Sequence, residues 1–344
     1  MTLPVLMLPI VAIVIGLIVL VWSADKFVYG AASLAQSMGM STLMVGLTIV
    51  ALGTSAPEIM VSVISSIADS PTLAIGNALG SNIANIGLVL GVTTLVCALP
   101  TQSRLLRKEL PLLLLVTVGA IALLANQQFT ALDGSLLLVG LALFILWLIM
   151  DSKSGGDISS EGSTGIGDST DNGDSTDNGQ SEDQNSPSTA KSISWFLFAL
   201  ALLLCSSKML VWGAIEIALE LGIDEVIIGL TIVAIGTSLP ELAASIISAL
   251  KGHHDLAIGN IIGSNILNLL AVMPFPGLLA AGPINADIFW RDGLTVMGLT
   301  ALLALFLYAS GKKGKLNRFH GVTFLCIYCG YLWVLYQASA TTGI

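Results

Sequence analysis

Residues 46–58 read GLTIVALGTSAPE, and the same pattern returns 183 positions later as GLTIVAIGTSLPE, residues 229–241. A second stretch is repeated at the same spacing: residues 74–85 read AIGNALGSNIAN, and residues 257–268 read AIGNIIGSNILN. Over positions 46–90, 25 of the 45 residues are identical to those 183 positions later. The matches include Gly, Thr, Ser, Pro, Glu and Asn, so shared apolar composition does not explain them. The chain therefore contains an internal duplication.

The composition is typical of a membrane protein. Of the 344 residues, 55% are hydrophobic and only 10% are charged, and the mean hydropathy is +0.90. A soluble domain has about a quarter of its residues charged, so we predict an integral membrane protein whose partner is the lipid bilayer. The formal net charge of −9 argues against a nucleic-acid partner.

Ten segments are apolar enough to span a bilayer, which requires about 20 residues. They are 4–30, 42–67, 72–97, 110–125, 132–150, 193–220, 226–250, 256–281, 288–309 and 319–338. The predicted fold is an all-α integral membrane protein of ten transmembrane helices. The first segment is interpreted as a retained span, because no basic region or clear cleavage site accompanies it.

A polar segment, 151–191, separates the fifth and sixth predicted spans. It contains nine acidic residues and two lysines, and it lacks the apolar side chains that a folded core requires. We therefore predict a first five-helix half at 1–150, an acidic disordered cytoplasmic linker at 151–191, and a second five-helix half at 192–344.

An odd number of spans in each half gives the two halves inverted topology, as in many secondary transporters. The loops support this arrangement, because ten of the 13 basic residues fall on one side of the membrane. They are Arg104, Arg107, Lys108, Lys153, Lys191, Lys251, Lys312, Lys313, Lys315 and Arg318. The positive-inside rule makes that side cytoplasmic. Both termini are therefore predicted to lie outside a plasma (inner) membrane.

Each copy of the first motif places a carboxylate inside an apolar segment. An unpaired charge there costs about 3 kcal/mol or more, so Glu58 and Glu241 require a proton, a partner or a cation. Hydroxyl groups precede them by three or four residues, and these belong to Thr54, Ser55, Thr237 and Ser238. Residues four apart lie on one helix face, so oxygen atoms are expected to cluster beside each carboxylate.

A proline, Pro57 or Pro240, interrupts each motif helix, because it cannot donate a backbone hydrogen bond and clashes with the carbonyl four residues earlier. We expect the interruption to release backbone carbonyls near Ala51 and Ala234. Interrupted helices at corresponding positions of two halves are typical of an ion site near the bilayer midplane.

The second motif adds amide and hydroxyl oxygens, and in each copy a Ser and an Asn four residues later share a helix face. The candidates are Asn77, Ser81, Asn82, Asn85, Asn260, Ser264, Asn265 and Asn268. Together the motifs offer carboxylate, hydroxyl, amide and carbonyl oxygens, without imidazole or thiolate. Such a set favours a hard cation, calcium or sodium, over zinc or copper.

The paired motifs resemble the alpha-1 and alpha-2 repeats of the sodium/calcium exchanger family, within the cation/calcium antiporter superfamily. The ten-span layout extends the resemblance to the whole chain outside the linker. The family implies two inverted five-helix halves, with four ion sites between the second, third, seventh and eighth helices.

The resemblance also implies roles for individual residues. Glu58 and Glu241 would bind both calcium and sodium, and Asn85 and its counterpart Asn268 would lie centrally. The other implied ligands are the side chains of Thr54, Ser55, Ser81, Thr237, Ser238 and Ser264, with the carbonyls of Ala51 and Ala234.

One position departs from part of the family. Some relatives carry Asp where this chain has Asn268, and the potassium-dependent branch characteristically has an acidic residue in this region. Asn at both positions 85 and 268 leaves two central carboxylates and argues against potassium dependence. The proton-coupled branch typically has GN-x-x-E in place of GN-x-x-GSN, so sodium is the better candidate for the driving ion.

The predicted function is secondary active exchange of Ca²⁺ for Na⁺ by alternating access, in a monomer that needs no cofactor and is not an enzyme. Two carboxylates balance one calcium ion, and sodium ions compete for the same oxygens. An H⁺/Ca²⁺ antiporter is the main alternative. A cation channel is less well supported, because an inverted pair within one chain suits alternating access.

Overall fold

The computed structural model describes residues 3–100, 103–154, 189–222, 232, 234–311 and 314–342, and nearly all of them are helical. Before the predicted linker, the helices and π-helical turns are α1 (Leu3–Met38), α2 (Thr42–Val45), η1 (Gly46–Val50), α3 (Ala51–Thr54), α4 (Ala56–Ile67), α5 (Pro71–Ala84), η2 (Asn85–Leu90), α6 (Gly91–Val96), η3 (Leu105–Glu109), α7 (Leu110–Leu123) and α8 (Ala131–Ser154). After it they are α9 (Thr189–Glu220), α11 (Ala234–Thr237), α12 (Leu239–Leu250), α13 (His254–Leu267), η6 (Asn268–Val272), α14 (Pro274–Leu279), η7 (Ile288–Gly293), α15 (Leu294–Ser310) and α16 (Arg318–Thr342). The short strands are β1 (Leu99–Pro100), β2 (Gln128–Phe129), β3 (Gly282–Pro283) and β4 (Lys315–Leu316).

The helices confirm a multi-pass membrane protein. Among the described residues, seven helices are long and apolar enough to cross a bilayer, or eight if the bent pair Thr42–Thr54 and Ala56–Ile67 forms one span. Two predicted spans are not among them. α7 has only 14 residues, and the span at 226–250 lies partly outside the described residues, leaving α12 with 12. The total of ten spans therefore stays a prediction.

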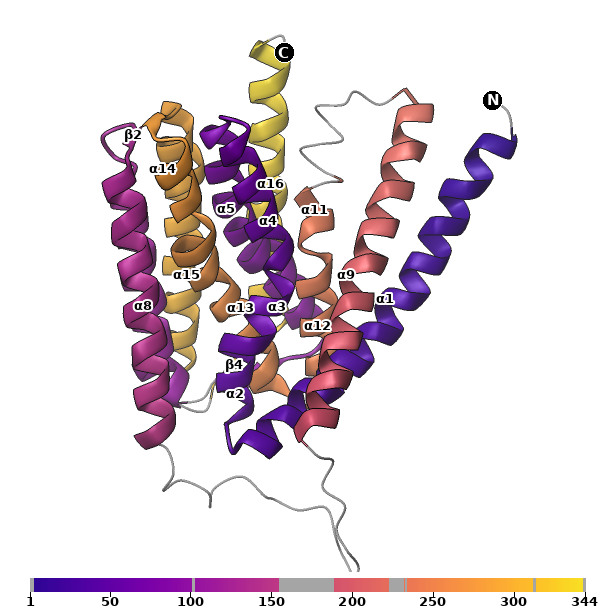
Figure 1. The fold of residues 1–344 in the computed structure, drawn as a ribbon, viewed down its shortest axis with the longest axis vertical. Helices are drawn as coiled ribbons and strands as arrows, with labels where there is room; N and C mark the ends of the chain where they lie inside the picture. The colour runs from indigo at the N-terminus through magenta and orange to yellow at the C-terminus, as the bar shows by residue number, and fades with distance from the viewer. Residues whose placement is uncertain are drawn as a thin grey trace, which may run out of the picture.

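The bundle has two ends, which are distinguished by the linker. Figure 1 shows both chain ends at one end of the bundle, here called the terminal side. The end of α8 and the start of α9 lie at the opposite end, the linker side. Helices α3, α4, α11 and α13 lie in the interior, between the α1–α9 pair and α8.

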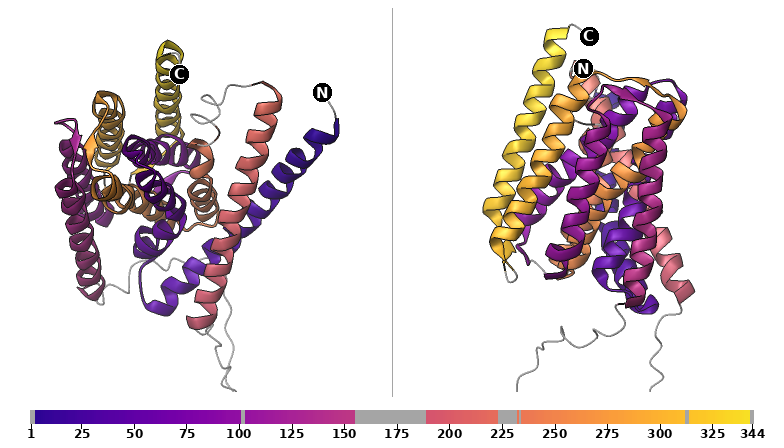
Figure 2. Two further views of the ribbon diagram at one scale, coloured as in Figure 1. Left: turned by 45° about the horizontal axis from the view of Figure 1, so that its top comes forward. Right: turned by 90° about the vertical axis from the view of Figure 1, so that its left-hand side faces the viewer.

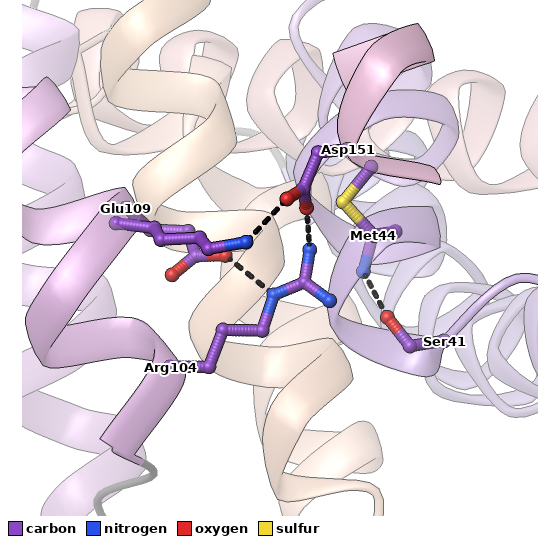
Figure 3. A network of polar contacts seen from close by, with 6 residues as sticks. Ser41, Met44, Arg104, Glu109 and Asp151 are labelled. Atoms are coloured by element: carbon purple, nitrogen blue, oxygen red, sulfur yellow. Dashed lines mark hydrogen bonds and ion pairs between the residues drawn. The ribbon is translucent and has the colours of Figure 1, made fainter. Parts of the chain in front are cut away.

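Both flanking helices extend a few residues into the predicted linker 151–191. α8 continues to Ser154, and α9 starts at Thr189. The end of α8 is tied to the start of α7 by ion pairs that Figure 3 shows. Arg104 Nε donates to Glu109 Oε1 at 2.9 Å, and the same guanidinium pairs with Asp151. Residues 155–188 lie outside the described residues, so the predicted disorder is not tested.

The first helix of each half lies against the other in the opposite direction (Figures 1 and 2). A Cβ on Gly30 of α1 would stand 3.1 Å from the Phe196 backbone of α9, and a Cβ on Gly213 would stand 2.9 Å from Ile13. Phe196 and Gly213 are the residues 183 positions after Ile13 and Gly30. The two contacts are therefore equivalent and exchanged, as across a two-fold axis.

The strand pairs repeat this exchange. β1 pairs antiparallel with β4, and β2 pairs antiparallel with β3. β1 and β2 belong to the first half, and β3 and β4 belong to the second. Each half therefore contributes one strand to each pair. The two pairs close opposite ends of the bundle.

Two glycines bring the motif helices of different halves into backbone contact. A Cβ on Gly259 of α13 would lie 2.6 Å from the Leu43 carbonyl, and a Cβ on Gly46 of η1 would lie 2.7 Å from the Leu256 carbonyl. Small residues allow such close helix packing inside membranes. The crossing places the second motif of one half against the first motif of the other.

Candidate ion-binding site

The predicted interruption of the motif helices is present in both halves. α3 ends at Thr54 and α4 begins at Ala56, with a bend of 45° between them. Ser55 stands at the bend with φ −82° and ψ 5°, and Pro57 occupies the first turn of α4, where a missing N–H leaves no helical bond unmade. Ser238 takes nearly the same conformation, φ −88° and ψ 2°, between α11 and α12.

The expectation that the interruption frees the Ala51 carbonyl was wrong. This oxygen accepts the Ser55 N–H at 2.9 Å and lies 3.4 Å from Thr54 Oγ1. The reason is positional, because the bond that a proline at 57 would prevent in an uninterrupted helix is the one to residue 53 and not the one to residue 51. A carbonyl oxygen has two lone pairs, so Ala51 retains some capacity to face a cation.

The two motif carboxylates are buried together. Glu58 and Glu241 each expose only 1% of their surface. Ser55 donates its hydroxyl to Glu241 Oε1 at 3.4 Å, so the first motif of one half contacts the carboxylate of the other. Among the described residues neither carboxylate has a cationic side chain as partner. Two such buried charges are strongly destabilising unless a cation or a proton compensates them.

Asparagine side chains fix the surrounding helices. Thr54 Oγ1 donates to Asn260 Oδ1 at 3.2 Å, and Asn260 Nδ2 donates to Ser245 Oγ at 3.1 Å. Asn77 Nδ2 donates to the backbone carbonyl of Glu58 at 3.2 Å. These bonds fix the Thr54 hydroxyl and the first turn of α4, which carries Glu58.

Asn82 and Asn265 lie at the centre of the duplication. Asn82 Nδ2 donates to the Asn265 carbonyl at 3.2 Å, and the two residues are 183 positions apart. A residue contacts its own counterpart only close to a two-fold axis. Asn85 and Asn268 follow one turn later and begin the π-helical turns η2 and η6, a feature common at functional sites.

Several buried oxygens of the motifs have no hydrogen-bond partner within the part of the chain that the structure describes. They are Glu58 Oε2, Glu241 Oε2, Asn82 Oδ1, Asn85 Oδ1, Ser238 Oγ, Ser264 Oγ, Asn265 Oδ1 and Asn268 Oδ1. Leaving a buried polar atom unpaired costs about 1–3 kcal/mol, and native structures contain few such atoms. Their concentration in the motif copies fits a bound cation, which oxygen lone pairs would coordinate.

The predicted site residues all lie in the central helices. Those exposed by 5% or less are Ala51, Thr54, Ser55, Glu58, Ser81, Asn85, Ser238, Glu241, Ser264 and Asn268. Thr237, at the end of α11, is half-buried, and Ala234 begins the same helix.

Sequence reasoning missed two equivalent serines beside the carboxylates. Ser62 Oγ donates to the Val272 carbonyl at 2.8 Å, and Ser245 accepts the Asn260 amide. Each serine follows a motif glutamate by four residues, and this repeated spacing was the signal that could have found them.

Two buried acidic residues outside the motifs were also missed. Glu109 and Asp292 are 183 positions apart, and both are buried. Each has an arginine partner: Glu109 contacts Arg104 at 2.9 Å, and Asp292 contacts Arg291 at 2.7 Å. They are structural ion pairs at the starts of α7 and α15.

A cavity of about 460 Å³ extends to the motifs from the terminal side, between α4, α9 and the α11–α12 break. Its lining includes Pro57, Thr237 and Pro240, which are close neighbours in sequence of the buried carboxylates, and also Lys208. The cavity therefore reaches residues next to both motif carboxylates from one side of the bundle.

This chemistry is that of a hard-cation site beside a cavity, inside a bundle of membrane-spanning helices. Among the described residues, no three His, Cys, Asp or Glu side chains group as a transition-metal site would require. The fold and the site together define an integral membrane cation transporter.

The comparisons with known proteins agree on one family. The profile described as sodium/calcium exchanger protein matches residues 8–150 and 191–337. The chain is 33% identical to the sodium/calcium exchanger MaX1 of Methanosarcina acetivorans, over 94% of this chain and 97% of that protein. It is 36% identical to the inner membrane protein YrbG of Escherichia coli, over 95% and 96%. A solved structure of the sodium-calcium exchanger NCX_Mj, soaked with Na⁺ and Sr²⁺, superimposes with a TM-score of 0.76 at 30% identity, covering 94% of this chain and 97% of that one.

The chain belongs to the sodium/calcium exchanger family. It is a transmembrane antiporter of calcium and sodium and not an enzyme.

Proposed function

We propose that this protein exchanges Ca²⁺ for Na⁺ by alternating access, with overlapping ion sites centred on Glu58 and Glu241. The observation that carries the proposal is the set of buried motif oxygens, those of Glu58 and Glu241 among them, that have no hydrogen-bond partner among the described residues. A divalent cation balances their charge of −2, and sodium ions use the same kind of oxygen ligand.

We propose the same ligand set that the sequence predicts. The hydroxyl and amide ligands are Thr54, Ser55, Ser81, Asn85, Thr237, Ser238, Ser264 and Asn268, and the carbonyl ligands are those of Ala51 and Ala234. The burial of Ala51, Thr54, Ser55, Ser81, Asn85, Ser238, Ser264 and Asn268 in the central helices supports this assignment. Calcium requires 6 to 8 oxygens, so two carboxylates alone do not suffice.

The scaffold for this function is a pair of inverted five-helix halves, 1–150 and 192–344, joined by the linker 151–191. The opposite directions of α1 and α9 and the exchanged contacts of Gly30 and Gly213 support the inversion. An inverted pair has two related conformations that open to opposite sides of the membrane. The linker side is proposed to be the cytoplasmic side of an inner membrane, because Arg104, Lys251 and other basic residues lie there.

Coupling follows from competition for the same oxygens. Calcium and several sodium ions cannot occupy overlapping sites together, so the carrier reorients with one load or the other. Purified protein in sealed vesicles tests the driving ion. Calcium uptake should follow an outward sodium gradient and should not follow a proton gradient, whereas the reverse result would favour an H⁺/Ca²⁺ antiporter.

Potassium should not be required for transport. Asn268 is buried and neutral, so it cannot balance an additional monovalent cation. Sodium-driven calcium uptake should be equal with potassium or with choline in the buffer. A wild-type protein that stalls without potassium would refute this assignment of Asn268.

Replacing residues 155–188 by a Gly/Ser spacer of the same length should leave transport nearly unchanged. The segment lacks the apolar residues that a folded domain needs. A spacer is required because the end of α8 and the start of α9 lie apart, at opposite edges of the linker side (Figure 1). Calcium uptake by the replaced protein is the measurement. Loss of activation by linker-side calcium, with basal uptake retained, would instead assign a sensing role to the two DSTDNG repeats in 168–179.

A further inference from the structure

Two cavities on opposite sides of the bundle are lined in part by equivalent residues of the two halves. The 460 Å³ cavity of the terminal side is lined by Lys208 and Trp212 of α9 and by residues of α4. The second cavity, about 320 Å³, is lined on the linker side by Asp25 and Tyr29 of α1, with Lys251 at the end of α12. Lys208 and Trp212 are the residues 183 positions after Asp25 and Tyr29. Exchange by alternating access would open these two cavities in turn.

The two cavities are not in the same state. On the terminal side the cavity separates α9 from Met60, Val61 and Ile64 of α4. The counterparts of these three residues, Ala243, Ala244 and Ile247 of α12, instead pack against α1 in one apolar cluster. Ala244 exposes only 1% of its surface. The linker side is therefore closed where the terminal side is open.

An ion pair joins the two helices on the closed side. Lys251 Nζ lies 2.6 Å from Asp25 Oδ1, and it also donates to the Asp25 backbone carbonyl at 3.3 Å. The open side has no equivalent pair, because Lys208 replaces the aspartate and Ala68 replaces the lysine. Within the part of the chain that the structure describes, Lys208 makes no ion pair.

We propose that the Asp25–Lys251 ion pair is a gate latch that holds α1 against α12 and keeps the linker side closed in this conformation. Opening the linker side requires α1 to separate from Ala243 and Ala244, and the ion pair must break in that step. Because the duplicated half has no counterpart, the pair biases the exchanger toward the state open to the terminal side. The proposal rests on the alternating access proposed above.

A single cysteine at the closed interface reports the latch directly. Alanine replaces the native cysteines Cys97, Cys205, Cys326 and Cys329, and Ala244→Cys is introduced. The rate at which a membrane-impermeant maleimide, added on the linker side, labels this cysteine is then measured. Asp25→Asn or Lys251→Gln should raise the labelling rate by about three- to fivefold, the effect expected of one partly exposed ion pair. The reversed pair, Asp25→Lys with Lys251→Asp, should restore slow labelling.

Lys26→Gln is the matched control. Lys26 also contacts Asp25, at 3.4 Å. Both residues lie on α1, so this contact does not connect α1 to another helix. The proposal is overturned if labelling is unchanged in Asp25→Asn, or if Lys26→Gln accelerates it equally. Calcium uptake by wild type is measured in parallel. Failure of uptake counts against the exchange function, whereas unchanged labelling in an active exchanger counts against the latch alone.

Discussion

Glu58→Gln and Glu241→Gln are each expected to abolish calcium transport while the protein remains folded. Glutamine has nearly the same shape but carries no charge, so the site charge falls from −2 to −1 and no longer balances calcium. Removing one partner of a buried ionic interaction costs about 3–5 kcal/mol, so calcium affinity should fall by more than about a hundredfold. Calcium uptake into vesicles and calcium binding in detergent measure both effects.

The matched control is Glu220→Gln, which makes the same chemical change at an exposed position near the end of α9. It should transport calcium at the wild-type rate. Equal thermal unfolding of all three variants would show that folding is preserved. Wild-type calcium flux in either motif variant would contradict the placement of the site.

Gly263→Val is expected to give the second-largest effect. A Cβ at this position of α13 would lie 2.4 Å from the Leu47 carbonyl and 2.7 Å from Ala51 Cβ. Since backbone atoms cannot move aside cheaply, the α13 helix must separate from η1 and α3. Overpacking of a well-packed core costs about 1–3 kcal/mol, and the separation should also displace Thr54 from the site. A lower unfolding temperature together with reduced calcium uptake is the expected result.

Gly298→Val is the control for this substitution. A Cβ on Gly298 of α15 meets no atom within 4 Å among the described residues. Its unfolding temperature and calcium uptake should match those of wild type. Equal losses in the two variants would show that valine in a helix, rather than the close crossing at Gly263, causes the effect.

The duplicated motifs predicted the helix interruptions because their causes are local. Pro57 and Pro240 end one helix and begin the next through their own covalent geometry, and the bend at Ser55 follows from it. Burial of Glu58 and Glu241 also followed from local sequence, since each lies in an apolar segment. The family assignment was confirmed by the profile that matches 8–150 and 191–337.

Tertiary features could not be predicted in this way. The contact between Asn82 and Asn265 depends on where the two-fold axis passes, which no single segment specifies. The burial of Glu109 beside Arg104 could not be predicted, because it depends on how the helices pack around η3. The error at the Ala51 carbonyl was different in kind, because it came from the local register: Pro57 affects the bond to residue 53, and the Ser55 N–H still bonds Ala51.

Equilibrium calcium binding under increasing sodium tests most directly whether both ions use one set of oxygens. Calcium titrations of the purified protein are performed in detergent at several sodium concentrations, with choline replacing sodium. Sodium should raise the apparent dissociation constant for calcium without changing the number of calcium ions bound at saturation. Calcium affinity that is independent of sodium would show that the two ions bind at separate places, and it would contradict exchange through a shared site at Glu58 and Glu241.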